Sequence, residues 1–365
     1  MAKYIYEHKN WPSFTWNDSA INVLFGEVRN LQGKIKGQMS GLGFSSKELA
    51  VLSTLTSDVI KSSEIEGEKL NLNEVRSSIA RKLGINTGGL VKSGRDVDGV
   101  VEMVLDATLH YNKSLSHKRL YSWHAALFPT GYSGLYKIQV GRYRSKEMQI
   151  VSGGIGKEKV HYEAIPAIRI NDEMNAFIEW INKNSSLDPV LQAAIAHFWF
   201  IIIHPFDDGN GRIARAISDL LLARAEKSSE RFYSMSKQIL LERKKYYETL
   251  QKVQHSNGDI TEWMVWFLTC LKNALVETQN SIQIIFKKTG FWNKHETTIL
   301  NERQRIMLNK LLDGIDGKLK SSKWAKMTKC SEDTALRDIK DLIEKGILQR
   351  EAQGGRSTNY ELVPF

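Results

Sequence analysis

Apolar residues recur at a helical spacing over most of this 365-residue chain, and that periodicity constrains the fold more than any other feature. Residues that break helices are few, with 26 glycines and 6 prolines in the whole chain. Helices are expected over residues 45–64, 71–82, 96–112, 190–203, 213–224, 244–253 and 260–286. The sequence therefore predicts an all-α architecture in which any β-structure is small.

Cysteine content and hydropathy exclude several classes of protein. Cys270 and Cys330 are the only cysteines and form no C-x-x-C pattern, so neither a disulfide framework nor a cysteine-based zinc site is expected. Two such cysteines fit a reducing compartment, and we expect a cytoplasmic protein without a signal peptide. The longest apolar run, residues 190–203, is about 14 residues long, whereas a membrane span needs roughly 20. We expect a buried helix there and no membrane partner.

Changes in pattern along the chain predict three regions. Residues 1–85 are expected to form an N-terminal helical region, residues 86–287 a helical core, and residues 295–365 a separate module after a linker near 288–297. Within the core, two short apolar runs flank a glycine cluster at 152–156 and predict a β-hairpin, or flap. The last region combines three helical segments with two short strands, which is the pattern of a winged helix.

The segment HPFDDGNGRIAR at residues 204–215 follows one apolar helix and opens another. The first turn of a helix has unpaired N–H groups and a positive dipole end, which together favour a phosphate. Gly209 and Gly211 leave the backbone amides accessible, and Arg212 and Arg215 are spaced to lie on one face of the helix. An ordinary surface turn with an ion pair is the alternative that these residues leave open.

Two further side chains of this segment suit phosphate chemistry. Asp208 provides hard oxygen ligands of the kind that bind Mg²⁺ between phosphates. His204 lies at the opposite lip of the loop and is the candidate general base. His197, seven residues upstream on the apolar helix, is expected to be a core residue outside the site.

Residues 204–215 resemble the signature of the Fic family, H-x-F-x-[D/E]-G-N-G-R-x-x-R, at every specified position. The resemblance covers roughly residues 50–275 and implies a Fic helical bundle that transfers AMP from ATP to a protein hydroxyl. It implies that His204 deprotonates the target Ser, Thr or Tyr, that Asp208 holds Mg²⁺, and that Arg215 binds the γ-phosphate. The amides of Gly209, Asn210, Gly211 and Arg212, with the Asn210 side chain, would hold the other phosphates.

Residues 62–67, SSEIEG, resemble the Fic inhibitory motif [S/T]-x-x-x-E-[G/N]. In the family this glutamate competes with the γ-phosphate for the second arginine of the signature. The resemblance therefore implies that Glu66 pairs with Arg215 and that Ser62, one turn earlier, supports the pair. If residues 62–67 are considered apart from the signature, the alternative is that Glu66 is an ordinary exposed carboxylate at a helix end.

The resemblance also assigns residues to the substrate pockets. In the family the flap binds the target segment by adding a strand, and the matching positions are Val151, Val160, His161 and Tyr162. Val160 and Tyr162 could equally be packing residues. Tyr246, Tyr247 and Gln254 match the positions that line the adenosine pocket, with helix packing as the alternative for the two tyrosines.

The C-terminal module leaves its partner open. The whole chain has a formal net charge of +10, which suits nucleic acid, nucleotide phosphates or simple solubility alike. Basic and acidic residues nearly balance over 301–365. Arg337, Lys340, Arg350 and Arg356 could contact DNA phosphates, whereas a protein-binding or homodimer role is the alternative.

Three other functions are alternatives to an autoinhibited AMP transferase. The same loop could transfer another nucleotide, or remove AMP from a modified protein with the help of the inhibitory glutamate. A nucleotide-sensing winged-helix transcription regulator is the third alternative, although an intact His204 argues against it because a sensor needs no base.

Overall fold

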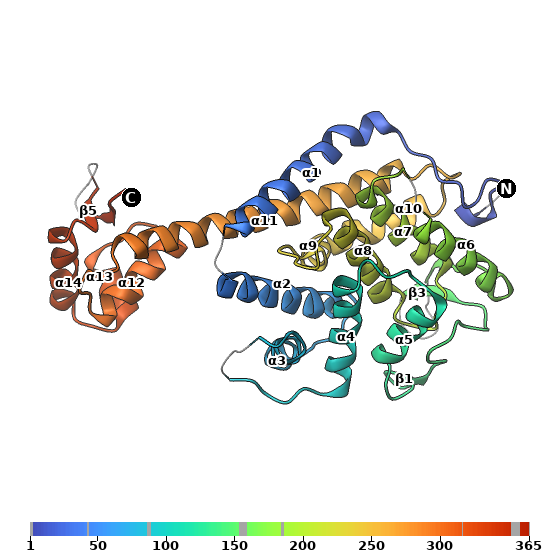
Figure 1. Ribbon diagram of the computed structural model, residues 1–365, viewed down its shortest axis with the longest axis horizontal. Helices are drawn as coiled ribbons and strands as arrows, with labels where there is room; N and C mark the ends of the chain where they lie inside the picture. Colours follow the sequence, from blue (N-terminus) through green and yellow to red (C-terminus); the bar gives the residue numbers. More distant parts are fainter. Residues whose placement is uncertain are drawn as a thin grey trace. The chain divides into compact units, whose positions relative to one another are not determined.

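The structure is a computed structural model that describes residues 3–41, 44–85, 89–152, 159–183, 186–315, 317–351 and 358–364. It confirms the all-α prediction, because the described ranges contain fourteen α-helices and only short β-hairpins. The chain divides into two compact units, residues Met1–Thr278 and Gln279–Phe365. Each unit is described by itself below (Figure 1).

The first unit is a helical bundle. Its helices are α1 (Asp18–Ser40), α2 (Phe44–Ile65), α3 (Leu72–Leu83), α4 (Arg95–Leu109), α5 (His117–Leu127), α6 (Ile170–Asn182), α7 (Pro189–Ile203), α8 (Asn210–Glu226), α9 (Met235–Leu241), α10 (Arg243–Val253) and the first part of α11 (Thr261–Lys294). Helices α1, α5, α6 and α9 have no counterpart among the segments expected from the sequence. In α1 the reason is polarity, since most of its residues are exposed and only five are buried.

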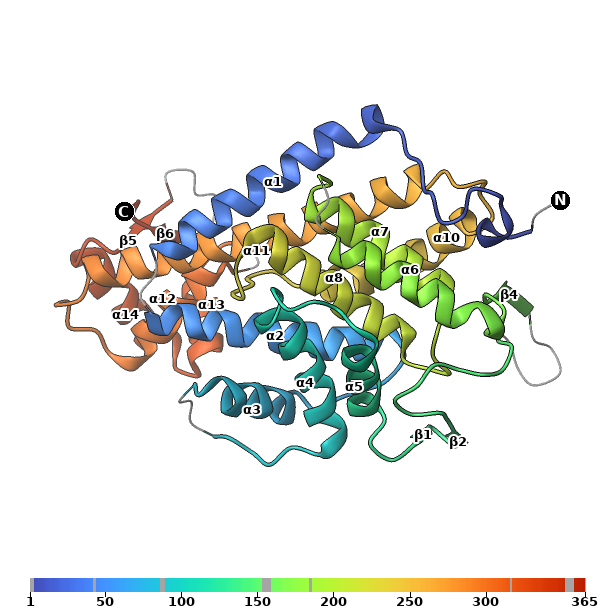
Figure 2. The ribbon, with the colours of Figure 1, turned by 45° about the vertical axis from the view of Figure 1, so that its right-hand side comes forward.

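Helices α7 and α8 lie side by side in the middle of this unit, with α2 beside α8 (Figures 1 and 2). Asp188 caps α7 by accepting a hydrogen bond from the Val190 amide at 2.8 Å, and Pro189 occupies the first turn. Nearly all of α7 is buried, which explains its apolar surface on every side. Since both helices are fixed in the core, the loop between them has two rigid ends.

His197, on α7, is fully buried and satisfied within this core. Its Nδ1 lies 2.9 Å from Ser218 Oγ, and its Nε2 lies 3.0 Å from the Tyr246 hydroxyl. Burial lowers the pKa of His197 to about 3, so the ring is neutral. It links α7, α8 and α10 as a structural residue.

Two antiparallel hairpins follow α5. Strands β1 (Tyr132–Ser133) and β2 (Tyr136–Lys137) form a short hairpin that the sequence pattern did not resolve. Strands β3 (Gln149–Ser152) and β4 (Lys159–Glu163) form the hairpin expected as the flap, with an irregularity between Ile150 and Val151. The glycine-rich tip at 153–158 lies outside the described residues.

The N-terminal segment fastens the flap to α10. It includes a short 3-10 helix, η1 (Ile5–Glu7), and the Ile5 amide donates to the Gln254 carbonyl at 2.7 Å. The Tyr6 hydroxyl donates to the Glu163 carbonyl at 3.1 Å, and Tyr4 packs edge-on against Tyr162 at 5.1 Å between ring centroids. Residues far apart in the sequence thereby hold β4 in place.

The second unit has its own core. It contains the end of α11, α12 (Glu302–Asp313), α13 (Ser321–Thr328), α14 (Glu332–Glu344) and the antiparallel strands β5 (Leu348–Arg350) and β6 (Tyr360–Leu362). Trp324, Met307 and Ile339 are buried at its centre. Helix α11 continues to Lys294, through most of the segment that was expected to be a linker.

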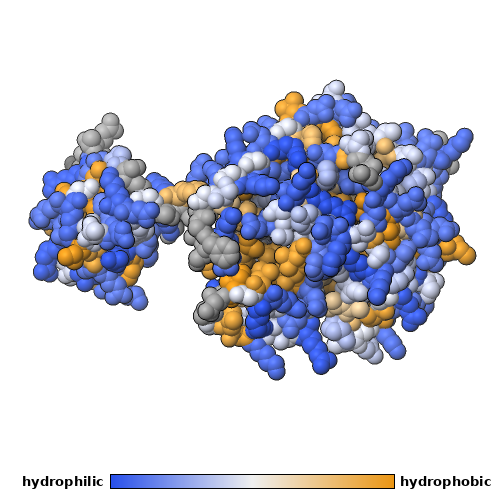
Figure 3. Space-filling view, in the orientation of Figure 1, coloured by the Kyte–Doolittle hydropathy of each residue, from blue (hydrophilic) through white to orange (hydrophobic). Residues whose placement is uncertain are grey.

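The surface of the first unit includes exposed apolar side chains. Leu49 and Leu72 line a groove of about 560 Å³ between α2 and α3, and apolar atoms gather over these helices in Figure 3. Over the described ranges, no helix combines the length and the hydropathy that crossing a bilayer demands.

A buried charge cluster joins α2 to α8. Arg231 donates to Asp219, on α8, at 2.5 Å and to Asp58, on α2, at 3.0 Å, and all three side chains are almost fully buried. Asp58 also accepts hydrogen bonds from Ser234 Oγ at 2.6 Å and from the Ser236 amide at 3.3 Å. Burial raises the pKa of Asp219 well above its usual range, with Asp58 adding to the shift and Arg231 opposing it.

Arg231→Met should destabilise the first unit strongly, because it leaves two buried carboxylates without their cation. We expect a loss of about 3–5 kcal/mol in the free energy of unfolding, measured by urea denaturation followed by circular dichroism. Lys252→Met is the matched control, since its ion pair with Glu262 is largely exposed and should contribute at most about 1 kcal/mol. Equal stability of the two variants would contradict a structural role for Arg231.

Candidate functional site

The loop between α7 and α8 is set by left-handed backbone at both ends. His204 ends α7 with φ 51°, and Gly209 precedes α8 with φ 79°. The Asn210 side chain closes the loop, since its Oδ1 accepts from the Phe206 amide at 3.0 Å and its Nδ2 donates to the Phe206 carbonyl at 2.8 Å. The structure therefore engages the Asn210 side chain within the loop, and its contact with a phosphate stays a prediction.

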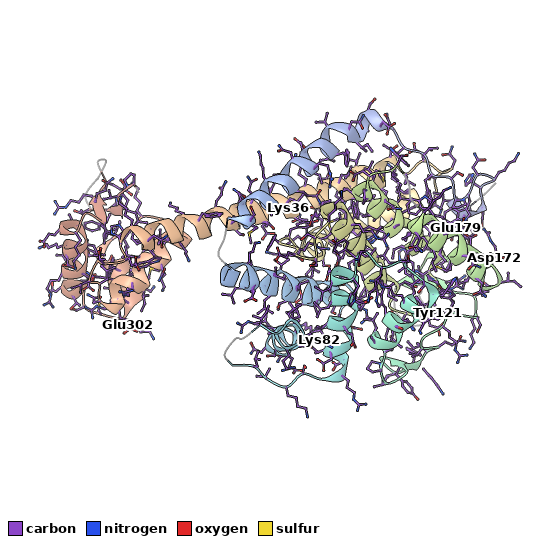
Figure 4. The ribbon with its side chains drawn as sticks, in the orientation of Figure 1. Lys36, Lys82, Tyr121, Asp172, Glu179 and Glu302 are labelled. Atoms are coloured by element: carbon purple, nitrogen blue, oxygen red, sulfur yellow. The ribbon has the colours of Figure 1, made fainter. Side chains whose placement is uncertain are left out.

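Phe206 anchors the loop in the core. Its ring is fully buried and stacks on His124 at 4.3 Å between centroids, with an interplanar angle of 10°. Tyr143 packs against it at 5.2 Å, and Tyr121 of α5, labelled in Figure 4, approaches edge-on at 6.5 Å. The backbone that follows Phe206 is fixed by these contacts.

His204 is held neutral at the entrance of the loop. Its Nδ1 lies 3.3 Å from the Ile201 carbonyl, and its own carbonyl accepts from Arg144 Nε at 2.8 Å. Burial, assisted by the nearby Arg144 charge, lowers the pKa of His204 to about 4. The imidazole can therefore accept a proton at neutral pH, as a general base must.

Two glycines at the start of α8, Gly209 and Gly211, leave space beside the backbone. A Cβ built on Gly211 would lie 2.2 Å from Glu66 Oε1, so this glycine provides the space that the carboxylate fills. At Gly209 a Cβ would lie 2.9 Å from the Phe128 ring, and the positive φ there also favours glycine. A negatively charged group thus occupies the positive end of α8.

Arg215 meets the C-terminal end of α2. Its Nε donates to Ser62 Oγ at 2.8 Å, and its Nη2 donates to the Ser62 carbonyl at 2.9 Å and to Glu66 Oε1 at 2.7 Å. Burial lowers the pKa of Arg215, but the Glu66 carboxylate outweighs that effect, so the pKa lies above its ordinary value. The structure thus brings together Ser62, Glu66 and Arg215, the three residues that the two motifs indicated.

Arg212 has a different acidic partner. Its Nη1 donates to Glu68 Oε2 at 2.6 Å, and its guanidinium lies 5.0 Å from the centre of the Phe128 ring. The Arg212 side chain is 2% exposed, whereas that of Glu68 is 43% exposed. Burial raises the pKa of Glu68, and Arg212 opposes the shift.

Asp208 lies at the outer edge of the loop. Its Oδ1 accepts from the Gly209 amide at 2.5 Å, and its Oδ2 accepts from Ser133 Oγ of the β1–β2 hairpin. Across the part of the chain that the structure describes, no group of three His, Cys, Asp or Glu residues could hold a metal. One carboxylate beside a phosphate cradle still fits Mg²⁺, which commonly binds one or two carboxylates together with substrate phosphates.

A pocket of about 630 Å³ opens beside the loop. It is lined by Glu66, Ile150, His161, Tyr162, Ile201, His204, Gly211, Arg243, Lys244, Tyr246, Tyr247, Glu248, Leu250, Gln251 and Gln254. Tyr246 is buried, with its hydroxyl on His197, whereas Tyr247 is 41% exposed. Gln254 Nε2 donates to the His161 carbonyl at 2.9 Å, so this amide holds the flap as well as lining the pocket.

The flap residues separate into exposed and buried positions. Val160 is 41% exposed and pairs in register with Val151, whose side chain lies outside the described residues. Tyr162 is 3% exposed and donates its hydroxyl to the Ile202 carbonyl at 2.8 Å. The structure therefore places Tyr162 in the core, and His161 beside the pocket.

Sequence reasoning missed three residues that complete the site: Glu68, Arg144 and Ser133. Arg144 Nη2 donates to the Ile165 carbonyl at 2.5 Å, in addition to holding the His204 carbonyl. Local patterns offered no signal for Arg144 or Ser133, because both act through tertiary contacts. Glu68, two residues beyond Glu66, could have been suspected from its charge and position.

The basic residues of the C-terminal module that could contact DNA are exposed where the structure describes them. Arg337 and Lys340 are exposed on α14, Arg350 is exposed on β5, and Arg356 lies outside the described residues. Glu332 and Asp333, in the first turn of α14, are exposed as well. A contact with DNA and a homodimer both stay predictions.

Two segments of the chain match known domain families. Residues 114–222 match the Fic/DOC family, and residues 4–85 match a domain of unknown function, DUF4172. A similar protein from Nematostella vectensis, named protein adenylyltransferase Fic, is 25% identical over 60% of this chain and 47% of its own length. A protein of the same name from Drosophila willistoni is 38% identical over 28% of this chain and 19% of its own length. The matches therefore span less than half of these relatives.

Solved structures share the helical fold. A Fic family protein from Desulfovibrio desulfuricans G20 aligns with 96% of this chain and 98% of its own, with a TM-score of 0.56 and 21% identity. A Fic domain containing signaling protein from Bacteroides thetaiotaomicron VPI-5482 aligns with 72% of this chain and 97% of its own, with a TM-score of 0.51 and 18% identity.

The neutrality of His204 can be tested by titration. In the nucleotide-free protein its imidazole should stay neutral as the pH falls below the ordinary histidine pKa of about 6.5 and should become charged only near pH 4. Proton–nitrogen correlation spectra of the histidine rings would follow this, with His204→Asn assigning the resonance. A midpoint near 6.5 would contradict the effect of burial and Arg144.

Proposed function

We propose, from the match of residues 114–222 to the Fic/DOC family, that this chain is a protein adenylyltransferase held in an inhibited state by Glu66. It transfers AMP from ATP to a Ser, Thr or Tyr hydroxyl of a protein target and of itself. The observation that carries the proposal is the Glu66 carboxylate, 2.7 Å from Arg215 and directly over Gly211, where a phosphate of the nucleotide would bind.

The reaction forms a bond between the target hydroxyl oxygen and the α-phosphorus of ATP and breaks the bond from that phosphorus to the bridging oxygen. Pyrophosphate leaves, and the hydroxyl proton moves to His204, which is neutral and lines the pocket. The amides at the start of α8 and the arginines of the loop bind and orient the triphosphate. Asp208 would hold Mg²⁺, which when bound would neutralise phosphate charge.

The adenosine moiety belongs in the pocket of about 630 Å³, against Tyr246, Tyr247 and Gln254. The target segment would add a strand along the flap beside Val151, Val160 and His161, with backbone hydrogen bonds that tolerate many sequences. Tyr162 supports the flap from the core, since it is buried and bonded to Ile202.

The regions of the chain have separate roles in this proposal. Residues 1–85 carry the inhibitory segment, residues 86–287 form the catalytic core, and residues 295–365 form a winged-helix module. We place the protein in the cytoplasm, because Cys270 and Cys330 are both free. Two alternative reactions, transfer of another nucleotide and removal of AMP from a modified protein, would use the same residues. Identifying the reaction product would distinguish each of them from AMP transfer.

Glu66→Gly should raise auto-AMPylation by about tenfold or more, because the carboxylate and the γ-phosphate compete for the same guanidinium; each tenfold is roughly 1.4 kcal/mol of barrier. Incorporation of label from α-labelled ATP measures the effect. Glu66→Asp keeps the charge but shortens the reach, so it should release inhibition only in part. Arg215→Ala breaks the same pair but should stay inactive, since it also removes the phosphate ligand. Equal activity of Glu66→Gly and the wild type would overturn the inhibitory role.

The roles proposed for His204 and Asp208 can be told apart by measuring ATP binding and AMP transfer separately. His204→Ala should abolish AMP transfer while ATP still binds, because the base acts on the target hydroxyl and not on the nucleotide. Asp208→Ala should weaken the affinity for Mg-ATP, measured by calorimetry with and without Mg²⁺. Near-normal transfer by His204→Ala, or unchanged Mg-ATP affinity of Asp208→Ala, would remove the corresponding assignment.

A further inference from the structure

The contact between Glu68 and Arg212 has no role in the inhibitory motif, which ends at Gly67. Arg212 is nevertheless the other arginine of the phosphate loop, and its Nη1 is held by Glu68 at 2.6 Å. Its Nε is buried and has no hydrogen-bond partner among the described residues. In this state both arginines of the loop face a carboxylate from the segment that follows α2.

The end of α2 explains how one segment reaches both arginines. The Gly67 amide donates to the Glu64 carbonyl at 3.0 Å, and the Glu68 amide donates to the Ser63 carbonyl at 3.0 Å. With Gly67 at φ 88°, this pattern is a Schellman motif, which ends the helix and reverses the chain sharply. Glu66 and Glu68 therefore lie on either side of the turn and contact different arginines.

The two side chains of the Arg212–Glu68 ion pair differ in how far they are exposed. Arg212 is 2% exposed and lies against the Phe128 ring, so its guanidinium is held in place without Glu68. The Glu68 side chain is 43% exposed and can turn toward water. A phosphate oxygen could then take its place on the same Arg212 nitrogen, as a charge-assisted hydrogen bond of similar geometry.

We propose that Glu68 is a second inhibitory carboxylate, which occupies Arg212 while Glu66 occupies Arg215. This inference rests on the proposed function and deepens it. Inhibition then has two points of contact, and full release requires both carboxylates to leave the loop. Since Asp58 fixes α2 to Arg231, the change that releases them is local to residues 62–68.

Glu68→Gln tests the second contact, because it removes the charge and keeps the shape. It should tighten the binding of Mg-ATP about threefold and raise auto-AMPylation by a similar factor, the scale expected of a half-exposed ion pair. Glu66→Gly/Glu68→Gln should exceed Glu66→Gly by about the same factor. Binding of a fluorescent ATP analogue labelled on the ribose, and incorporation of α-labelled AMP, are the two readouts.

Glu64→Gln is the matched control, since Glu64 lies close by in the last turn of α2 but pairs with Lys61 at 2.7 Å. It should leave ATP binding and auto-AMPylation at the wild-type level. If Glu68→Gln behaves like Glu64→Gln, or binds ATP more weakly than the wild type, Glu68 is not inhibitory, and activation of Glu66→Gly would still support the proposed function. If Glu66→Gly is not activated, the proposed inhibition itself fails, whatever Glu68→Gln does.

Discussion

The buried guanidinium of Arg231 is the contact on which the rest of the site depends. It joins Asp58 of α2 to Asp219 of α8, and all three side chains are almost fully buried, so losing one partner would leave a buried charge unpaired. Asp58 lies on α2 about two turns before the helix ends at Ile65, next to Glu66, and Asp219 lies one turn after Arg215 on α8. One buried cation therefore ties the helix that precedes Glu66 to the helix that carries Arg215.

Opposite helix ends meet in the site. The carbonyl end of α2, which carries partial negative charge, contacts Arg215 through the Ser62 carbonyl. The amide end of α8, which carries partial positive charge, lies beneath the Glu66 carboxylate. Under the proposed function, the triphosphate would compete with the Glu66 carboxylate for this surface.

The sequence was sufficient for the parts of the site that are continuous in the chain. Helical periodicity predicted most of the bundle, and the spacing from His204 to Arg215 predicted the loop, since both depend on neighbours in sequence. The pattern could not reveal that Asn210 would bond within the loop or that Gln254 would hold β4. Such contacts depend on packing between segments, as does the polar helix α1, whose few buried residues give a weak periodic signal.

The missing side chain of Gly211 has a mutational consequence. A Cβ there would collide with the Glu66 carboxylate, and it would occupy the space where the proposed function puts a phosphate. Under the proposed function, no substitution at Gly211 can free the enzyme from inhibition without damaging it. Mutations that only release inhibition are therefore expected among residues 62–68, which contact the two arginines from the other side. A change there would alter how the enzyme is switched on and would leave the loop itself untouched.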